Sequence, residues 1–196
     1  MKLKNYISGQ WIEGSGNEVP LYNAVNGELV AISDTEGIDF EQALDYGRTV
    51  GYKNLSSMTF YDRGEMLKKV ALYLLERKKK YYDLSYKTGA THADSWVDIE
   101  GGFGTFFTYS GLAKRMLPNT PFWVDGDTQK LGANGTFIGT HILTPSEGVS
   151  VQINAYNFPV WGMLEKLSTS LLAGVPSIVK PATPGSYLTN AVFRDM

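Results

Sequence analysis

Two side chains suited to chemistry lie in the stretch from Asn154 to Thr183, "NAYNFPVWGMLEKLSTSLLAGVPSIVKPAT". Asn157 comes shortly before Pro159, which suits the first turn of a helix because its missing N–H is not needed there. Lys180 ends a short apolar run and precedes Pro181. An amide can donate a hydrogen bond toward developing negative charge, and an ammonium can bind ribose hydroxyls or a phosphate. These residue types are therefore candidates for an oxyanion donor and a nucleotide contact.

The surrounding sequence predicts the elements that would position these two side chains. We expect strands over 149–154 and 176–180, and helices over 159–172 and from 186 onward. This strand–helix–strand–helix order is typical of a parallel α/β sheet. Ligands of open parallel sheets bind at the carboxyl ends of the strands, so Asn157 and Lys180 should share one rim. The free N–H groups of the helix start should face the same crevice.

A purely structural role is the alternative for both residues. The Asn157 side chain could simply cap its helix. The Lys180 ammonium could simply extend from the strand end into solvent. Residue spacing alone does not decide between these interpretations.

The first 120 residues predict short strands and turns followed by helices. Between Asn5 and Asp34, Gly, Asn, aromatic and β-branched residues alternate, which is typical of short strands. The helices are expected over 39–50, 61–82 and 94–116, the last with Trp96, Ile99, Phe103, Phe106 and Phe107 directed inward. The sequence "GGFGTF" lies in the last helix; it lacks the G-x-G-x-x-G spacing and a preceding strand, so its glycines more simply allow close helix packing.

Residues 121–148 have a different character. Pro, Gly, Asp and Asn separate short strand-like pieces, among them 136–143. We expect a hairpin whose exposed strand edges need a partner. The alternative is a hairpin packed against its own domain.

Composition limits the possible functions. The 196 residues have 43% hydrophobic and 19% charged residues, enough for a packed core, and a net charge of −2 that argues against a nucleic-acid binder. There is no cysteine, which excludes disulfides, thiolate metal sites and a cysteine nucleophile in this chain, and the two histidines lie far apart without ligand partners. The N-terminus has no long apolar core, so we expect no signal peptide, and no run approaches about 20 apolar residues. We expect a cytoplasmic protein without a metal, nucleic-acid or membrane partner.

"INAYNFPVWGM" followed by "IVKPAT" resembles the aldehyde dehydrogenase superfamily, in which P-W-N-F-P precedes a K-P-A/S-E segment at the same separation. The resemblance implies an α/β fold: a Rossmann-type parallel sheet, incomplete here, with N-terminal strands and helices and a β-hairpin oligomerisation arm. It divides the chain into the N-terminal part of the cofactor domain (1–120), the arm (121–148) and the start of the Rossmann-type unit (149–196). "KTGATHADSWVDIEGGFGTFFTYSG" is more similar still to members of phenylacetate degradation that carry a hydratase-like second half.

The resemblance also implies residue roles. Asn157 matches the amide that stabilises the oxyanion, and Lys180 matches the lysine that contacts the adenosine ribose. Tyr156 stands where many members have tryptophan, and Phe158 and Trp161 would line or support the substrate tunnel. The other residues that correspond to the family's cofactor-binding segments are Ile153, Asn154, Ala155, Pro181, Ala182 and Thr183.

The departures from the family matter as much. The family reaction uses a cysteine nucleophile and a glutamate that lie downstream of the K-P-A segment, and this chain ends at Met196 without a cysteine. We expect it to be the N-terminal portion of an NAD(P)-dependent aldehyde dehydrogenase, with a CoA-linked semialdehyde as a candidate substrate, and to be inactive alone. The alternative is a natural short homologue that serves as an oligomerisation or binding module.

The segment Lys180-Pro181-Ala182-Thr183 bears on the cofactor. Members that prefer NAD commonly have a glutamate three residues after the lysine, and a carboxylate there repels a 2′-phosphate. Thr183 is neutral, and its hydroxyl can donate to a phosphate oxygen. We therefore expect NADP to be preferred over NAD. The alternative is that Thr183 only caps the following helix.

Overall fold

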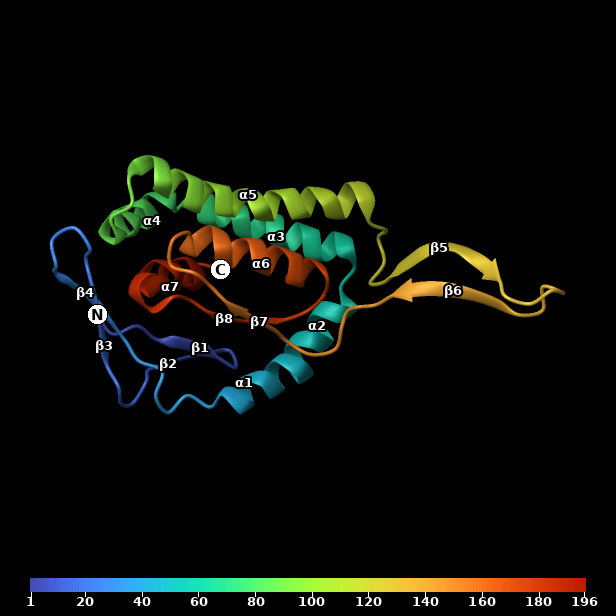
Figure 1. Ribbon diagram of the computed structural model, residues 1–196, viewed down its shortest axis with the longest axis horizontal. Coiled ribbons are helices and arrows are strands. Elements are labelled where there is room, and N and C mark those ends of the chain that lie inside the picture. Colours follow the sequence, from blue (N-terminus) through green and yellow to red (C-terminus); the bar gives the residue numbers. More distant parts are fainter.

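The computed structural model describes residues 1–196 as an α/β body with one projecting arm (Figure 1). Two antiparallel pairs open the chain: β1 (Asn5–Ile7) with β2 (Gln10–Ile12), and β3 (Val19–Tyr22) with β4 (Leu29–Ser33). These strands lie at the end of the body away from the arm (Figure 1).

The first helical segment runs further than the sequence predicts. It continues past Val50 as α1 (Phe40–Tyr46), a π-helical turn (Gly47–Gly51) and α2 (Tyr52–Ser57). Its two glycines allow close packing, because a Cβ on Gly47 would lie 2.6 Å from Val149 Cγ2 and one on Gly51 would lie 2.9 Å from Pro176 Cβ. The π turn thus rests against the residues just before the two later strands.

The single helix expected over 61–82 is wrong. The structure has α3 (Phe60–Leu75) and α4 (Lys78–Ser85), with a break at Glu76 and Arg77. Arg77 leaves helical geometry (φ −106°, ψ 4°), and its guanidinium lies 3.3 Å from the Tyr73 ring centroid and donates to the Tyr73 carbonyl over 2.9 Å. This side chain satisfies a carbonyl that a continuous helix would have bonded internally.

Three helices build most of the core. α3 packs along α5 (His92–Met116), and α5 packs along α6 (Pro159–Leu172), as Figure 1 shows. Ile99, Phe103 and Phe106 of α5 are buried as expected, but Trp96 is 55% exposed, so its predicted inward position is wrong. The fully buried side chains of α3 and α6 that meet them include Leu67, Ala71, Leu74, Val160 and Leu164.

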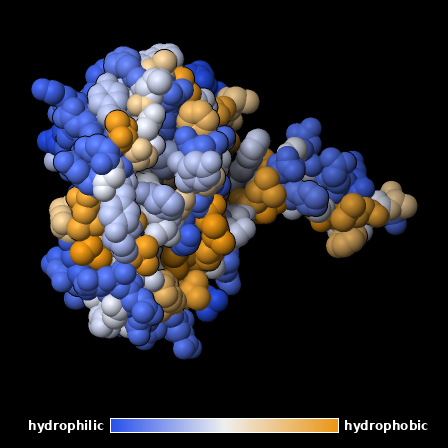
Figure 2. All heavy atoms as spheres, turned by 60° about the vertical axis from the view of Figure 1, so that its left-hand side comes forward, coloured by the Kyte–Doolittle hydropathy of each residue, from blue (hydrophilic) through white to orange (hydrophobic).

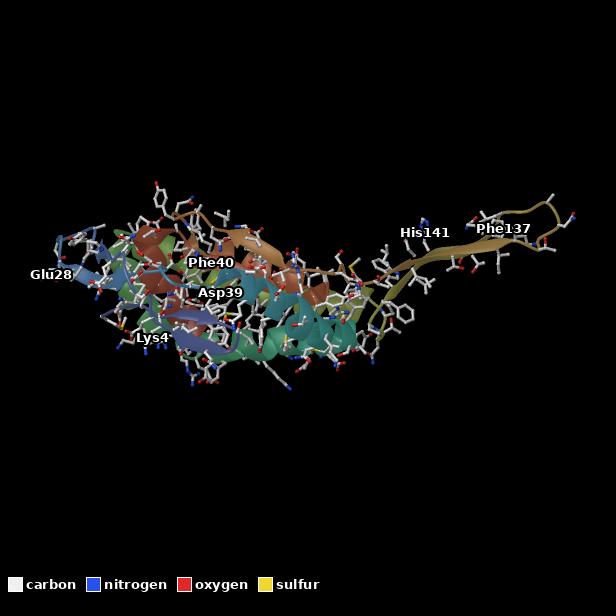
Figure 3. All side chains as sticks on the ribbon, turned by 90° about the horizontal axis from the view of Figure 1, so that it is seen from below. Lys4, Glu28, Asp39, Phe40, Phe137 and His141 are labelled. Atoms are coloured by element: carbon white, nitrogen blue, oxygen red, sulfur yellow. The ribbon has the colours of Figure 1, made fainter.

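The arm is an antiparallel hairpin of β5 (Trp123–Lys130) and β6 (Ile138–Leu143). It extends well away from the body in Figure 1, and every residue of β5 is exposed. Figure 3 shows Phe137 and His141 on this hairpin, far from the labelled residues of the body. The alternative of a hairpin packed against its own domain is not what the structure shows.

The C-terminal part forms the predicted parallel unit. β7 (Ser150–Ile153) and β8 (Ser177–Lys180) pair in parallel, with α6 between them in sequence. A 3₁₀ turn (Thr183–Gly185) then leads into α7 (Ser186–Arg194). The expected strand–helix–strand–helix order is confirmed, and the unit is Rossmann-like. None of the helices combines the length and the apolar character that crossing a membrane requires.

Candidate functional site

The carboxyl ends of β7 and β8 meet at one edge of the parallel pair. Ile153 is in register with Lys180, and the backbone N–H of Asn154 donates to the Lys180 carbonyl over 3.0 Å. The loop that carries Asn157 leaves from this point and ends at Pro159, the first residue of α6. The structure therefore brings the Asn157 loop and Lys180 to the same edge, as the strand order predicts.

Asn157 does not cap α6. Phe158 is the N-cap residue and makes no side-chain capping hydrogen bond, and Asn157 is exposed. The Asn157 amide takes part in none of the side-chain hydrogen bonds around this helix start. Its donors are therefore free for a ligand.

The start of α6 is capped from another helix instead. Asp98 Oδ1 of α5 accepts hydrogen bonds from the backbone N–H groups of Val160, over 3.0 Å, and Trp161, over 2.8 Å. The expectation that these N–H groups are free and face the crevice is wrong, because Asp98 satisfies them. Burial raises the pKa of Asp98 to about 6, although the two N–H donors favour its charged form.

Sequence reasoning missed Asp98, yet a signal existed. Ser95 and Gly102 are buried, and Asp98 falls on the same helical face, three residues after Ser95 and four before Gly102. An acidic residue on the buried face of a helix needs a compensating donor. That rule would have marked Asp98 as a residue with a specific partner.

Lys166 was also missed. Its ammonium donates to Oδ1 of Asn154, the residue that follows β7, over 2.6 Å. Asn154 is buried, and its Nδ2 has no hydrogen-bond partner. A buried amide with one unused donor group is a polar position that can serve a bound molecule.

Lys180, Pro181 and Thr183 border a cleft of about 870 Å³ between β8, α7 and the N-terminal strands. Lys180 is exposed and forms no ion pair. The Thr183 carbonyl accepts a hydrogen bond from Ser186 Oγ over 2.9 Å, while the Thr183 hydroxyl caps no helix. The first turn of α7, whose N-cap residue is Gly185, also lacks a side-chain cap. The Lys180 ammonium and the Thr183 hydroxyl are therefore the donors without a partner at the end of β8.

The predicted cofactor residues do not line one cavity. Ile153 borders a separate, open hollow of about 530 Å³ along β7, together with Lys166. Asn154, Ala155, Tyr156, Asn157 and Ala182 border neither of these two cavities. The proposed cofactor residues therefore lie along both strand ends rather than around a single cavity. No group of three or more His, Cys, Asp or Glu side chains is arranged to hold a metal ion.

Known proteins show the same sequence pattern and fold. A family model described as "Aldehyde dehydrogenase family" matches residues 11–194. The 3,4-dehydroadipyl-CoA semialdehyde dehydrogenase of Aromatoleum evansii is 38% identical over 197 residues, covering 100% of this chain and 38% of that protein.

Two solved structures share the fold at lower identity. A 3,6-anhydro-L-galactose dehydrogenase in complex with NAP has a TM-score of 0.83 at 23% identity, covering 100% of this chain and 39% of that one. An aldehyde dehydrogenase of Mycobacterium tuberculosis complexed with NAD⁺ has a TM-score of 0.81 at 22% identity, covering 99% and 39%. The chain thus spans about two fifths of the length of each of these proteins.

Proposed function

This chain belongs to the aldehyde dehydrogenase family, and from that premise we propose that it forms the cofactor-binding and oxyanion-stabilising part of an NAD(P)-dependent enzyme that oxidises an aldehyde to its acid. The observation that carries the proposal is the parallel pairing of Ile153 with Lys180, which brings the Asn157 loop and the lysine to one edge. Ligands of such sheets bind at this edge. The alternative of a non-catalytic assembly module gains no support from relatives that are dehydrogenases.

Asn157 is the proposed catalytic residue. Its exposed amide caps no helix, so it can donate to the oxygen that becomes negative when a nucleophile adds to the aldehyde carbon. The 196 residues contain no cysteine, so a thiol nucleophile would have to come from outside them. An oxyanion donor of this kind typically contributes about 10²–10³ in kcat.

The proposed cofactor contacts lie on both strand ends. Lys180 and Thr183 offer an unpaired ammonium and a free hydroxyl, which suit a ribose or a phosphate. The other proposed contacts are Ile153, Asn154, Ala155 and Tyr156 after β7, and Pro181 and Ala182 after β8. When bound, a nicotinamide cofactor accepts the hydride that leaves the aldehyde carbon during oxidation.

We propose that NADP is the preferred cofactor, with NAD as the alternative. No carboxylate pairs with Lys180, and Thr183 places no negative charge near it. Relatives of this fold carry either cofactor, so the preference rests on Thr183.

The proposed substrate is a CoA-linked semialdehyde of aromatic-acid breakdown, such as phenylacetate degradation. It is supported by the name of the 38% identical relative, a CoA-semialdehyde dehydrogenase. The proposed location of the enzyme is the cytoplasm.

The hairpin of residues 121–148 is proposed to pair with another copy of the chain. Its strands are exposed, and Figure 2 shows apolar residues at its base and near its tip. The cofactor-binding part would then consist of residues 1–120 and 149–196, which precede and follow the arm in the sequence. Isolated two-stranded hairpins are marginal in water, which favours a partner.

The test uses the dehydrogenase that carries this segment. We expect Asn157→Ala to lower kcat for aldehyde-dependent NADPH formation about 10²–10³-fold while the dissociation constant for NADP stays unchanged. Asn54→Ala, an exposed position in α2, is the matched control and should retain full activity. Full activity of the Asn157 variant would contradict the proposal.

A further inference from the structure

We propose that Asp98 is a positioning residue that fixes the start of α6 and thereby the loop carrying Asn157, an inference that rests on the proposed role of Asn157. The first step concerns the free donors of α6. Pro159 has no N–H, and the N–H of Gly162 already donates to the Phe158 carbonyl over 2.9 Å. Only Val160 and Trp161 are left with N–H groups in need of a partner.

Asp98 supplies that partner for both. One oxygen, Oδ1, accepts from Val160 and from Trp161. Most helices take such a cap from the residue just before them, but here Phe158 cannot provide one. The position of α6 therefore depends on α5, a helix that lies about 60 residues earlier in the sequence.

Two glycines next to Asp98 bring the helices close enough for this contact. A Cβ on Gly102 would lie 3.1 Å from the Trp161 Cα and 3.2 Å from its nitrogen, and one on Gly101 would lie 2.9 Å from the Trp161 ring. A Cβ on Gly104 of the same helix would have no other atom within 4 Å. Trp161 thus packs directly on Gly101 and Gly102, and Asp98 bonds the Trp161 backbone N–H at this contact.

The loop between β7 and α6 is consequently held at both ends. At its start, the Asn154 N–H donates to the Lys180 carbonyl over 3.0 Å. At its end, Asp98 holds Val160 and Trp161. Asn157 lies between these two anchors and makes no capping bond of its own. The position of its amide relative to a ligand therefore depends on how firmly these two ends of the loop are held.

Asp98 gains no ion pair in this position. It is 4% exposed, and no charged side chain contributes to the shift of its pKa, which burial alone raises. A carboxylate buried without a cation lowers the stability of the fold. The contact it makes with the α6 start, which also benefits from a negative charge near the helix N-terminus, is its evident role.

The experiment is a double-mutant cycle in the dehydrogenase that carries this segment, with kcat/KM as the readout. Asp98→Ala should lower kcat/KM about 10–100-fold, since small misplacement of a catalytic group has effects of this size. In an Asn157→Ala background the same change should cost less than about threefold, because the residue through which it acts is gone. Asp98→Asn retains an acceptor oxygen and should restore kcat/KM to within about threefold of the parent.

Glycine substitutions give a second measurement if Asp98→Ala fails to fold. Gly102→Ala pushes the Trp161 backbone and should lower kcat/KM in the same Asn157-dependent manner, whereas Gly104→Ala should have no effect. Losses from Asp98→Ala or Gly102→Ala that are equally large with and without Asn157 would overturn the inference. An Asn157→Ala enzyme with full activity would instead overturn the proposed function on which it rests.

Discussion

At the scale of single residues, Asp98 and Thr183 are polar side chains with different surroundings. Asp98 is buried and has only backbone donors as partners. Thr183 lies at the rim of the cleft beside β8, and its hydroxyl caps neither the 3₁₀ turn nor α7. Burial raises the pKa of Asp98, whereas Thr183 contributes no negative charge beside Lys180.

Asp98→Asn should change how stability depends on pH. The pKa of folded Asp98, about 6, lies above its ordinary value, so the folded state holds the proton more tightly than the unfolded chain. The stability that Asp98 contributes is therefore fully present below about pH 3.9 and lost as the pH rises through about 6. Asparagine does not ionise, so the variant does not lose stability at this position as the pH rises.

Urea unfolding of the two proteins between about pH 4 and pH 7.5 measures this. We expect the free energy of unfolding of the Asp98→Asn variant, relative to the parent, to increase by about 2–3 kcal/mol across that range. Asp83→Asn, a change of an exposed aspartate in α4, is the control and should show no such increase. A difference between variant and parent that is constant with pH would refute the assignment.

Thr183→Glu should move the cofactor preference toward NAD. A carboxylate near Lys180 would repel a 2′-phosphate, and a unit charge at close range costs more than about 1 kcal/mol. We expect the ratio of kcat/KM for NADP to that for NAD to fall at least about tenfold in the full dehydrogenase. Thr49→Glu adds the same charge to an exposed helical position and should leave the ratio unchanged. A parent that prefers NAD, or an unchanged ratio, would exclude Thr183 as the determinant.

At the scale of elements, the end of α6 depends on one glycine. Gly174 has φ +83°, and a Cβ there would overlap Arg63 Nη1 and lie 2.9 Å from Pro145 Cγ. Arg63 is fully buried, and its Nη2 donates to the Pro121 carbonyl over 3.3 Å. The turn after α6 therefore packs against Arg63 and Pro145, and Arg63 also bonds the start of the arm at Pro121.

Gly174→Ala should lower the free energy of unfolding by about 2–4 kcal/mol, the sum of a positive-φ cost and an overpacking cost. Gly27→Ala is the matched control, because Gly27 also has a positive φ, +75°, but faces open space. It should cost only about 1 kcal/mol. Equal losses of unfolding free energy for the two variants, measured by denaturant titration, would show that Arg63 can move aside without lowering stability.

The elements also show where sequence reasoning succeeds. Periodicity and turn residues located the parallel pair, α6 and α7 because each follows from local chemistry: Pro159 begins α6 and Gly174 follows its end. The break at Arg77 was missed because it depends on an arginine folding back onto Tyr73. Asp98 was missed because its partners, Val160 and Trp161, are distant in sequence. Local patterns predict elements, and contacts between distant residues decide the details of the site.

At the scale of the whole molecule, the arm exposes apolar side chains that a single copy of the chain leaves uncovered. Phe137, near the tip in Figure 3, is 65% exposed. Phe137→Asp should raise the dissociation constant of the proposed oligomer at least about tenfold, since a buried aromatic contact commonly contributes more than about 1 kcal/mol. Val25→Asp, an exposed apolar position in the β3–β4 turn, is the control. Analytical ultracentrifugation that finds the parent monomeric would contradict the proposal.

The parallel pair has a consequence for handling the 196-residue chain. β7 and β8 pair only with each other, so the outer edge of each strand keeps unpaired N–H and C=O groups. On β7, Val151 and Ile153 are 59% and 72% exposed. An open strand edge beside exposed apolar side chains is a template for intermolecular β-pairing. Expressed alone, the chain should therefore accumulate in inclusion bodies, and Val151→Lys, a charge of the kind that natural edge strands carry, should raise the soluble fraction.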